Sequence, residues 1–201
     1  MNTLDDSSSL FEYSADTQDS EFYTEYSPSH KSIIENDYML VNSTVSGLIV
    51  RNEGWVIVDK GGHVINSTVD NYGDMSVDCG GKVENITINQ GGLLCVYEEG
   101  FAENITLNGG QMYSDGVVNG LIIEDGGFAQ IWGPELNDVT VKQGGHIEIV
   151  NDTAVKNITL EADSTYYFII YGLTTMTGKY REQDFKITPL GRKTGILDVD
   201  K

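Results

Sequence analysis

The side chains that could form a catalytic or metal-binding site are few in this chain. The clearest regular series among them is acidic. Aspartate or glutamate returns at a turn position roughly every 19 residues, at Asp59, Asp78, Glu98, Asp115, Glu135 and Asp152. Hard cations prefer oxygen ligands, so an edge of this kind could order calcium. No Gly-Gly-x-Gly-x-Asp nonapeptide accompanies the series. We therefore interpret it as a solvated acidic edge and expect no metal site.

Catalytic residues are also not grouped in any recognisable way. His63 and His146 each follow a Gly-Gly pair but have no Cys/His ligand pair nearby. A β-helical enzyme that cleaves polysaccharide would need two carboxylates about 5 to 9.5 Å apart, or a calcium site beside a basic residue. The basic residues within the repeat belong to no motif: Arg51, Lys60, Lys82, Lys142 and Lys156. We expect a non-catalytic protein without cofactors; a polysaccharide lyase or glycoside hydrolase is the alternative.

Aromatic side chains that point outward are the candidates for binding, and the sequence predicts five: Trp55, Tyr97, Tyr113, Trp132 and Tyr167. Aromatic residues are enriched at protein interfaces, although isolated ones are common on any surface. From this set we select Trp55, Tyr113 and Tyr167 as candidate binding residues. A passive module that assembles with itself remains a further alternative.

These residues are positioned by a repeat of roughly 19 residues that occurs about seven times. Asn85-Ile86-Thr87-Ile88 and Asn104-Ile105-Thr106-Leu107 are two of its clearest copies. Apolar and polar residues alternate with a period of two, which is typical of half-buried strands. One short strand cannot bury its apolar face alone, but stacked copies about 4.8 Å apart can. The sequence therefore predicts an all-β, single-stranded parallel β-solenoid of about seven rungs with capping ends.

Aligned positions of the repeat predict which residues face the core. The first inward column comprises Leu48, Ser67, Ile86, Ile105, Leu121, Val139 and Ile158, and the second Val50, Val69, Ile88, Leu107, Ile123, Val141 and Leu160. Threonine often stands between the two columns, where a β-branched residue suits a solvated strand face. The glycines that end the turns are expected to adopt positive φ. They are Gly54, Gly73, Gly92, Gly110, Gly127 and Gly145.

Asn-x-Thr triplets have two interpretations. They match acceptors for N-glycosylation, and they occur at Asn42, Asn66, Asn85, Asn104, Asn151 and Asn157. Four of them fall at the same position of the repeat, so we favour a structural origin, in which asparagine forms the corner and threonine the strand.

The two ends differ from the repeat. Residues 1–44 are acidic and carry aromatic residues, which predicts a cap over the first rung or a partly disordered segment. Residues 45–171 are predicted to form the solenoid. Residues 172–201 hold half of the basic residues and are expected to cap the last rung, through strands at 185–188 and 195–199, or to lead into another domain.

Net charge and hydrophobicity exclude several partners. The formal charge of −19 and pI near 4.2 argue against nucleic acid and anionic membranes, which bind basic surfaces. No apolar run approaches 18 residues, so we expect no membrane insertion. No Sec-type signal peptide is recognisable near Met1. Two cysteines, Cys79 and Cys95, are too few for a small fold stabilised by several disulfides, and we expect no disulfide between them.

The segments Gly-Gly-His-Val-Ile-Asn-Ser-Thr-Val at 61–69 and Gly-Gly-Lys-Val-Glu-Asn-Ile-Thr-Ile at 80–88 carry a family resemblance. Over residues 45–171 the chain resembles the passenger repeats of AIDA-type autotransporter adhesins. That resemblance implies a secreted or surface-exposed β-helical scaffold that acts in adhesion or self-association. It also implies a host-cell or matrix glycan or protein, or a second copy, as partner, and glycosylation of outward threonines: Thr68, Thr87, Thr106 and Thr159.

Overall fold

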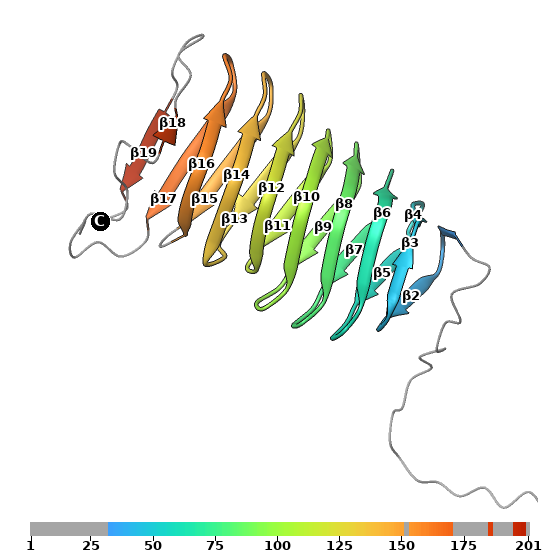
Figure 1. Ribbon diagram of the computed structural model, residues 1–201. Helices are drawn as coiled ribbons and strands as arrows, with labels where there is room; N and C mark the ends of the chain where they lie inside the picture. The colour runs from blue at the N-terminus through green and yellow to red at the C-terminus, as the bar shows by residue number, and fades with distance from the viewer. Residues whose placement is uncertain (1–31, 151–152, 171–184, 187–194, 200–201) are drawn as a thin grey trace, which may run out of the picture.

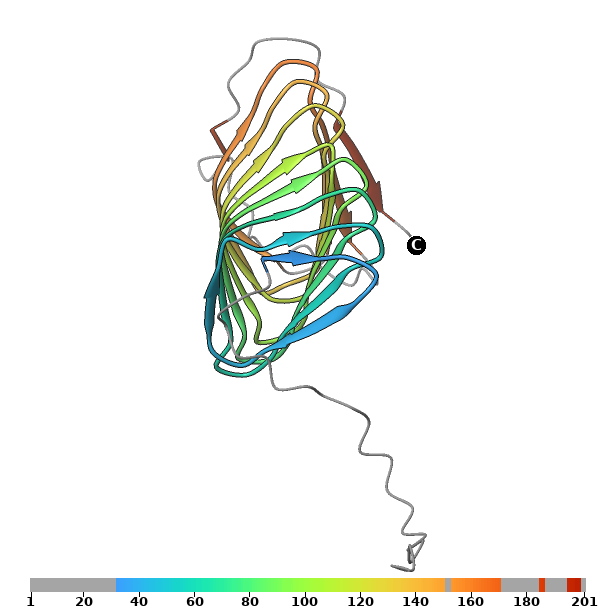
Figure 2. The same cartoon turned by 90° about the vertical axis from the view of Figure 1, so that its right-hand side faces the viewer.

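The computed structural model describes residues 32–150, 153–170, 185–186 and 195–199. Every regular element in these ranges is a β-strand, and the strands stack as a parallel β-solenoid of about seven turns (Figure 1). The view nearly along the stack shows successive turns enclosing one common interior (Figure 2). The predicted fold class is confirmed.

The strands form two sheets in which every paired strand is parallel to its neighbour. Sheet A contains β1 (Ile33–Ile34), β3 (Thr44–Ser46), β4 (Ile49–Val50), β6 (His63–Val69), β8 (Lys82–Asn89), β10 (Phe101–Asn108), β12 (Val117–Ile123), β14 (Glu135–Val141), β16 (Ala154–Leu160) and β18 (Phe185–Lys186). Sheet B contains β2 (Tyr38–Val41), β5 (Trp55–Val58), β7 (Asp74–Val77), β9 (Leu93–Val96), β11 (Gln111–Ser114), β13 (Phe128–Ile131), β15 (His146–Val150), β17 (Thr165–Ile170) and β19 (Gly195–Val199).

Pairing between neighbouring rungs confirms both predicted inward columns. Ile86 pairs with Ile105, Ile105 with Leu121, and Val139 with Ile158, although the sequence separations differ. Every residue of the two columns is buried, with at most 4% exposure. Inward residues of sheet B, such as Leu94 and Ile147, complete the same core. Because like residues stack on like, each interior rung buries its apolar residues against the rungs on either side.

Each long strand of sheet A bends at one residue in the left-handed backbone region. In β8 this residue is Asn85, with φ 55°. On either side of the bend, Val83 and Ile86 both point inward, so the bend resets the alternation of the strand. The equivalent residues also have positive φ: Gly47, Asn66, Asn104, Gly120, Asp138 and Asn157. Asparagine and glycine tolerate this conformation best, which confirms the structural interpretation for the four triplets at this position of the repeat.

The prediction that the glycines ending the turns adopt positive φ is wrong. Gly80 has φ +77°, but its successor Gly81 does not lie in the left-handed region. A Cβ at Gly81 would instead collide with the backbone carbonyl of Val58 in the previous rung. The same close approach to the previous rung applies to the six glycines expected at positive φ: Gly54, Gly73, Gly92, Gly110, Gly127 and Gly145. Close packing of rungs, and not backbone conformation, therefore excludes a side chain there.

Strands also occur in both end segments. β1 and β2, within the segment 1–44, pair with β4 and β5 and extend the two sheets by a partial turn. At the other end β18 pairs with β16, and β19 pairs with β17, in agreement with terminal strands at these positions. The remainder of both end segments lies outside the described residues.

Candidate binding face

The outer surface of sheet B, here called the sheet B face, gathers most of the exposed aromatic side chains. Two outward columns run across it, and paired strands define them. The first comprises Tyr38, Trp55, Asp74, Leu93, Gln111, Phe128, His146 and Thr165; the second comprises Leu40, Ile57, Ser76, Cys95, Tyr113, Gln130, Glu148 and Tyr167. The three selected residues all lie in these columns, Trp55 in the first and Tyr113 and Tyr167 in the second.

Rings on the sheet B face contact one another across rungs. Tyr113 packs edge-to-face against Phe128, with ring centroids 5.9 Å apart, and Phe128 packs similarly on His146 at 5.1 Å. His146 in turn lies 5.0 Å from Tyr167. These contacts connect Tyr113 and Tyr167 through two rings that the sequence did not mark as binding residues. Trp55 lies apart, and its indole Nε1 donates to Ser76 Oγ at 3.1 Å.

Beside the columns, the residue directly after each strand of sheet B forms a third line of equivalent positions. Val77, Val96, Ser114 and Ile131 are paired across rungs, so Asp78, Tyr97, Asp115 and Trp132 follow at equivalent places. The acidic series was therefore wrongly aligned at Glu98, because Tyr97 and not Glu98 occupies that line. Glu135 was also misplaced: it lies on sheet A, where its carboxylate accepts from Lys156 Nζ at 2.9 Å. Asp152 lies outside the described residues.

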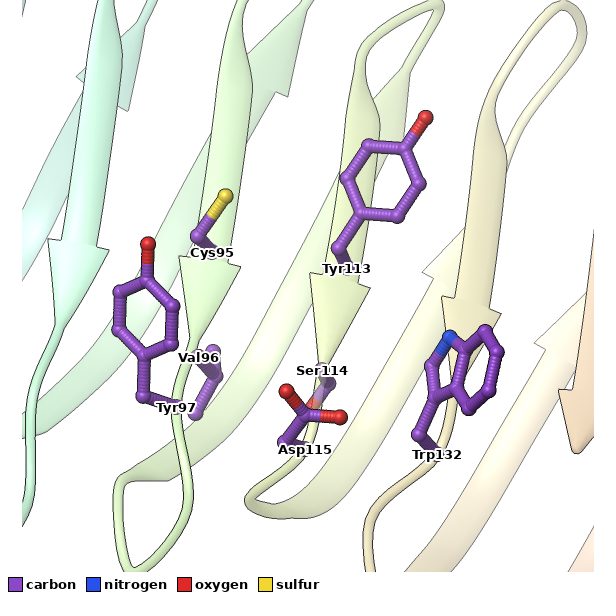
Figure 3. Close-up of a pocket in the computed structure, with 7 residues that line it drawn as sticks. All are labelled: Cys95, Val96, Tyr97, Tyr113, Ser114, Asp115 and Trp132. Carbon is purple, nitrogen blue, oxygen red and sulfur yellow. The ribbon is translucent and has the colours of Figure 1, made fainter. Parts of the chain in front are cut away.

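A hollow of about 320 Å³ opens on the sheet B face between these positions. It is lined by Cys95, Val96, Tyr97, Tyr113, Ser114, Asp115 and Trp132 (Figure 3). Figure 3 shows the rings of Tyr97 and Trp132 on either side of the Asp115 carboxylate, with Tyr113 on β11, the strand that ends just before Asp115. The exposures of Tyr97, Tyr113 and Trp132 are 49%, 39% and 43%. Their rings are therefore accessible to a ligand.

The surroundings of the hollow disfavour negative charge. The pKa of the Cys95 thiol is raised by burial and, to a smaller extent, by the carboxylates of Asp74 and Asp115. The pKa of Tyr97 is raised chiefly by the neighbouring Cys95, with contributions from burial and from Asp78 and Asp115. Both groups are thus neutral at physiological pH, and Asp115 is the charged residue of the lining.

Comparison with solved structures finds a related architecture. The chain matches the crystal structure of the TibC-catalysed hyper-glycosylated TibA55-350 fragment, from an autotransporter adhesin, with a TM-score of 0.62 and 27% sequence identity. The match covers 68% of this chain and 53% of that fragment, so the chain spans about half the fragment's length. The chain therefore shares a β-solenoid fold with this adhesin fragment. No family model matches the sequence, and no curated protein matches it.

Sheet A presents a different outer surface from the one just described. Thr68, Thr87 and Thr106 pair directly across rungs, and Thr159 occupies the same column further along. All four are half-buried. Beside them Lys82 Nζ lies 2.9 Å from Glu103 Oε2 and 3.2 Å from Glu84 Oε2, and 5.4 Å from the centroid of the Phe101 ring. This surface is rich in hydroxyl, amide and charged groups.

Neither histidine nor cysteine forms a metal site in the described part of the chain. His63 Nε2 lies 3.3 Å from Glu84 Oε2, and His146 Nε2 lies 3.4 Å from Glu148 Oε1. Cys79 and Cys95 are free thiols. Among the described residues, no group of three or more His, Cys, Asp or Glu side chains is placed to hold a metal. The same residues include no helix long and apolar enough to cross a membrane.

The line of Tyr97, Asp115 and Trp132 is the feature that sequence reasoning missed. Both aromatic residues were predicted to face outward, and Asp115 was assigned to the acidic edge, but they were not placed together. Aligning Val77 with Val96, the last inward residues of β7 and β9, would have revealed the relationship. The alignment of the repeats by their acidic residues instead placed Glu98 at the position that Tyr97 occupies.

Proposed function

We propose that this chain is a non-catalytic β-helical scaffold, secreted or displayed at a cell surface, that acts in adhesion or self-association through the sheet B face. One observation carries the proposal. Exposed large aromatic side chains gather on that face or directly after its strands: Tyr38, Trp55, Tyr97, Tyr113 and Trp132. Clusters of exposed aromatic residues are typical of surfaces that bind partners.

The similarity to the TibA fragment supports the proposed role and location. That fragment comes from an autotransporter adhesin passenger. A host-cell or matrix glycan or protein, or a second copy of the chain, would be the partner. The net charge of −19 makes nucleic acid an unfavourable partner, because phosphate backbones are bound by basic surfaces.

Glycosylation of the scaffold is a separate part of the proposal. The TibA fragment is hyper-glycosylated by TibC. In this chain Thr68, Thr87, Thr106 and Thr159 would be the acceptors, since they form one outward column on sheet A. Sugars there would leave the sheet B face free. Intact-mass measurement of the protein from its native source, followed by peptide mapping, tests this assignment.

Substitution of the face tests the proposed function. The variant Trp55→Ser/Tyr113→Ser/Tyr167→Ser removes three rings from the two columns, and Ile122→Ser removes an exposed apolar residue, 38% accessible, from sheet A as the matched control. We expect the triple variant to lose cell adherence, glycan-array signal or self-association in light scattering, and the control to retain them.

Two results would contradict the proposal. Equal binding and equal particle size for the triple variant and the native chain would remove the sheet B face as the binding surface. Release of new sugar ends from a polysaccharide would show instead that the chain is one of the β-helical enzymes. Far-UV circular dichroism on each variant establishes that the solenoid has formed.

A further inference from the structure

The hollow on the sheet B face combines two chemical features that occur together around bound organic cations. Three aromatic rings, from Tyr97, Tyr113 and Trp132, surround it, and the carboxylate of Asp115 lies between two of them. Aromatic ring faces attract cations through their quadrupole, and attraction increases as the cation loses its water. We infer that this hollow binds a quaternary ammonium group, such as the trimethylammonium head of choline.

Spacing along the solenoid suits such a ligand. Tyr97, Asp115 and Trp132 follow equivalent positions of β9, β11 and β13, so each is one rung from the next. At about 4.8 Å per rung, the two outer residues are separated by about 9.6 Å. A cation above Asp115 would lie about one rung from both rings, within the distance of about 6 Å over which cation–π attraction acts.

The charge around the hollow favours a cation over a neutral or anionic ligand. The lining contains no Lys, Arg or His, and Asp115 supplies its negative charge. Asp74 and Asp78 lie close enough to help hold the Cys95 and Tyr97 pKa values above their ordinary values. With a net charge of −19, the chain also attracts cations from a distance.

The chemistry of the lining distinguishes a methylated ammonium from a primary one. A primary ammonium is strongly hydrated and presents three N–H donors, which need several acceptors. A quaternary ammonium has no N–H group and presents methyl groups, which suit the faces of aromatic rings. Recognition of quaternary ammonium is the usual function of aromatic cages in proteins.

A second site in the protein, on sheet A, also combines an aromatic ring and carboxylates around an ammonium group. On sheet A the Lys82 ammonium stands 5.4 Å from the centroid of the Phe101 ring, between the carboxylates of Glu84 and Glu103. In that cluster the cation belongs to the chain. In the hollow, ring and carboxylate are present and the lining supplies no cation, so the ligand would complete the arrangement.

Choline and its neutral carbon isostere, 3,3-dimethyl-1-butanol, test the inference directly. Saturation-transfer NMR on the purified full chain would report binding of each at equal concentration and ionic strength. We expect a saturable signal for choline and at least about 5-fold weaker binding of the alcohol, because only the charge differs. Equal binding of both, no binding of choline, or preferential binding of methyl glucoside would overturn the inference.

Matched substitutions locate the site. Trp132→Ala and Asp115→Asn should each weaken choline binding at least about 5-fold, by loss of a ring or of the opposing charge. Tyr72→Ala is the control for the first, since Tyr72 is 71% exposed and does not line the hollow, and Asp59→Asn is the control for the second. If the control variants weaken binding as much as the site variants do, the hollow is not the site. These titrations involve neither cells nor self-association, so their outcome is independent of the proposed function.

Discussion

Asn104 donates a side-chain hydrogen bond to Asn85 in the previous rung, with its Nδ2 3.2 Å from the Asn85 Oδ1. Asn85 makes the same bond to Asn66 at 3.1 Å. All three residues have positive φ, near 50 to 55°. One residue type therefore both bends the strand of sheet A and links neighbouring rungs by amide hydrogen bonds.

Substitutions at Asn104 should separate these two contributions. Asn104→Gly keeps the left-handed backbone but loses the amide bond, and we expect a loss of about 0.5 to 1 kcal/mol in unfolding free energy. Asn104→Ala loses the bond and also places a Cβ at positive φ, for a total of about 1.5 to 3 kcal/mol. Urea unfolding measures both. An equal loss for the two variants would show that backbone strain contributes nothing.

A glycine at which close packing excludes a side chain should respond differently from one that only adopts positive φ. In Gly81→Ala the new Cβ would meet the Val58 carbonyl, and we expect a loss of about 2 kcal/mol or more. Gly47 has φ +73° and no heavy atom within 4 Å of a Cβ, so Gly47→Ala should cost only about 1 kcal/mol. Thermal unfolding compares the two. The reverse order would contradict the explanation by rung packing.

Ser67 is the polar member of the first inward column, and its hydrogen bonds should contribute to the stability of the fold. Its buried Oγ accepts from the Leu48 N–H at 2.9 Å and donates to the Ile65 carbonyl at 2.9 Å. Ser67→Ala leaves the Leu48 N–H without that acceptor, and we expect a loss of about 1 to 3 kcal/mol. Ser114→Ala is the control, because Ser114 is equally buried but makes one long bond, at 3.4 Å, to the Gly116 carbonyl. Similar losses for both serines would refute this account.

Asp74 should make stability depend on pH in the direction opposite to a salt-bridged carboxylate. Burial raises the pKa of Asp74 above 3.8, so the folded chain holds the proton more tightly than the unfolded chain does. Its contribution to stability therefore falls as pH rises from 3.8 through the folded pKa. We expect Asp74→Asn to be slightly more stable than the native chain at neutral pH, with the difference vanishing in acid. A stability difference that grows on acidification would contradict this sign.

Much of the fold could be predicted from local pattern, because the determinants are local. Ile86, Ile105 and Ile158 alternate with polar neighbours, and a period of two indicates which side of a strand is buried. Asparagine before each of these residues signals the corner, since few other residues tolerate positive φ. These two signals suffice for the strands, the core columns and the parallel stack.

The hollow depends on alignment between rungs, which local pattern does not determine. Phe101 pairs with Val117 and Lys82 with Phe101, so the number of residues in a turn changes from one rung to the next. Each change occurs in a turn, where the count of polar residues does not affect the core. The misplacement of Glu98 for Tyr97 has another cause: Val77 pairs with Val96, but the residue that follows Val77 is acidic and the residue that follows Val96 is aromatic. The requirement for glycine at position 81 could not be predicted from local pattern either, because the collision of a Cβ with Val58 depends on contact between rungs.

Over the described ranges, each strand of sheet A or sheet B pairs with the strands before and after it in the stack, and each joint is parallel. A tandem duplication of one whole unit would therefore lengthen the rod while leaving every existing joint intact. Length can thus evolve separately from surface chemistry, and a hollow such as the one beside Asp115 can arise from exchanges confined to two or three adjacent units.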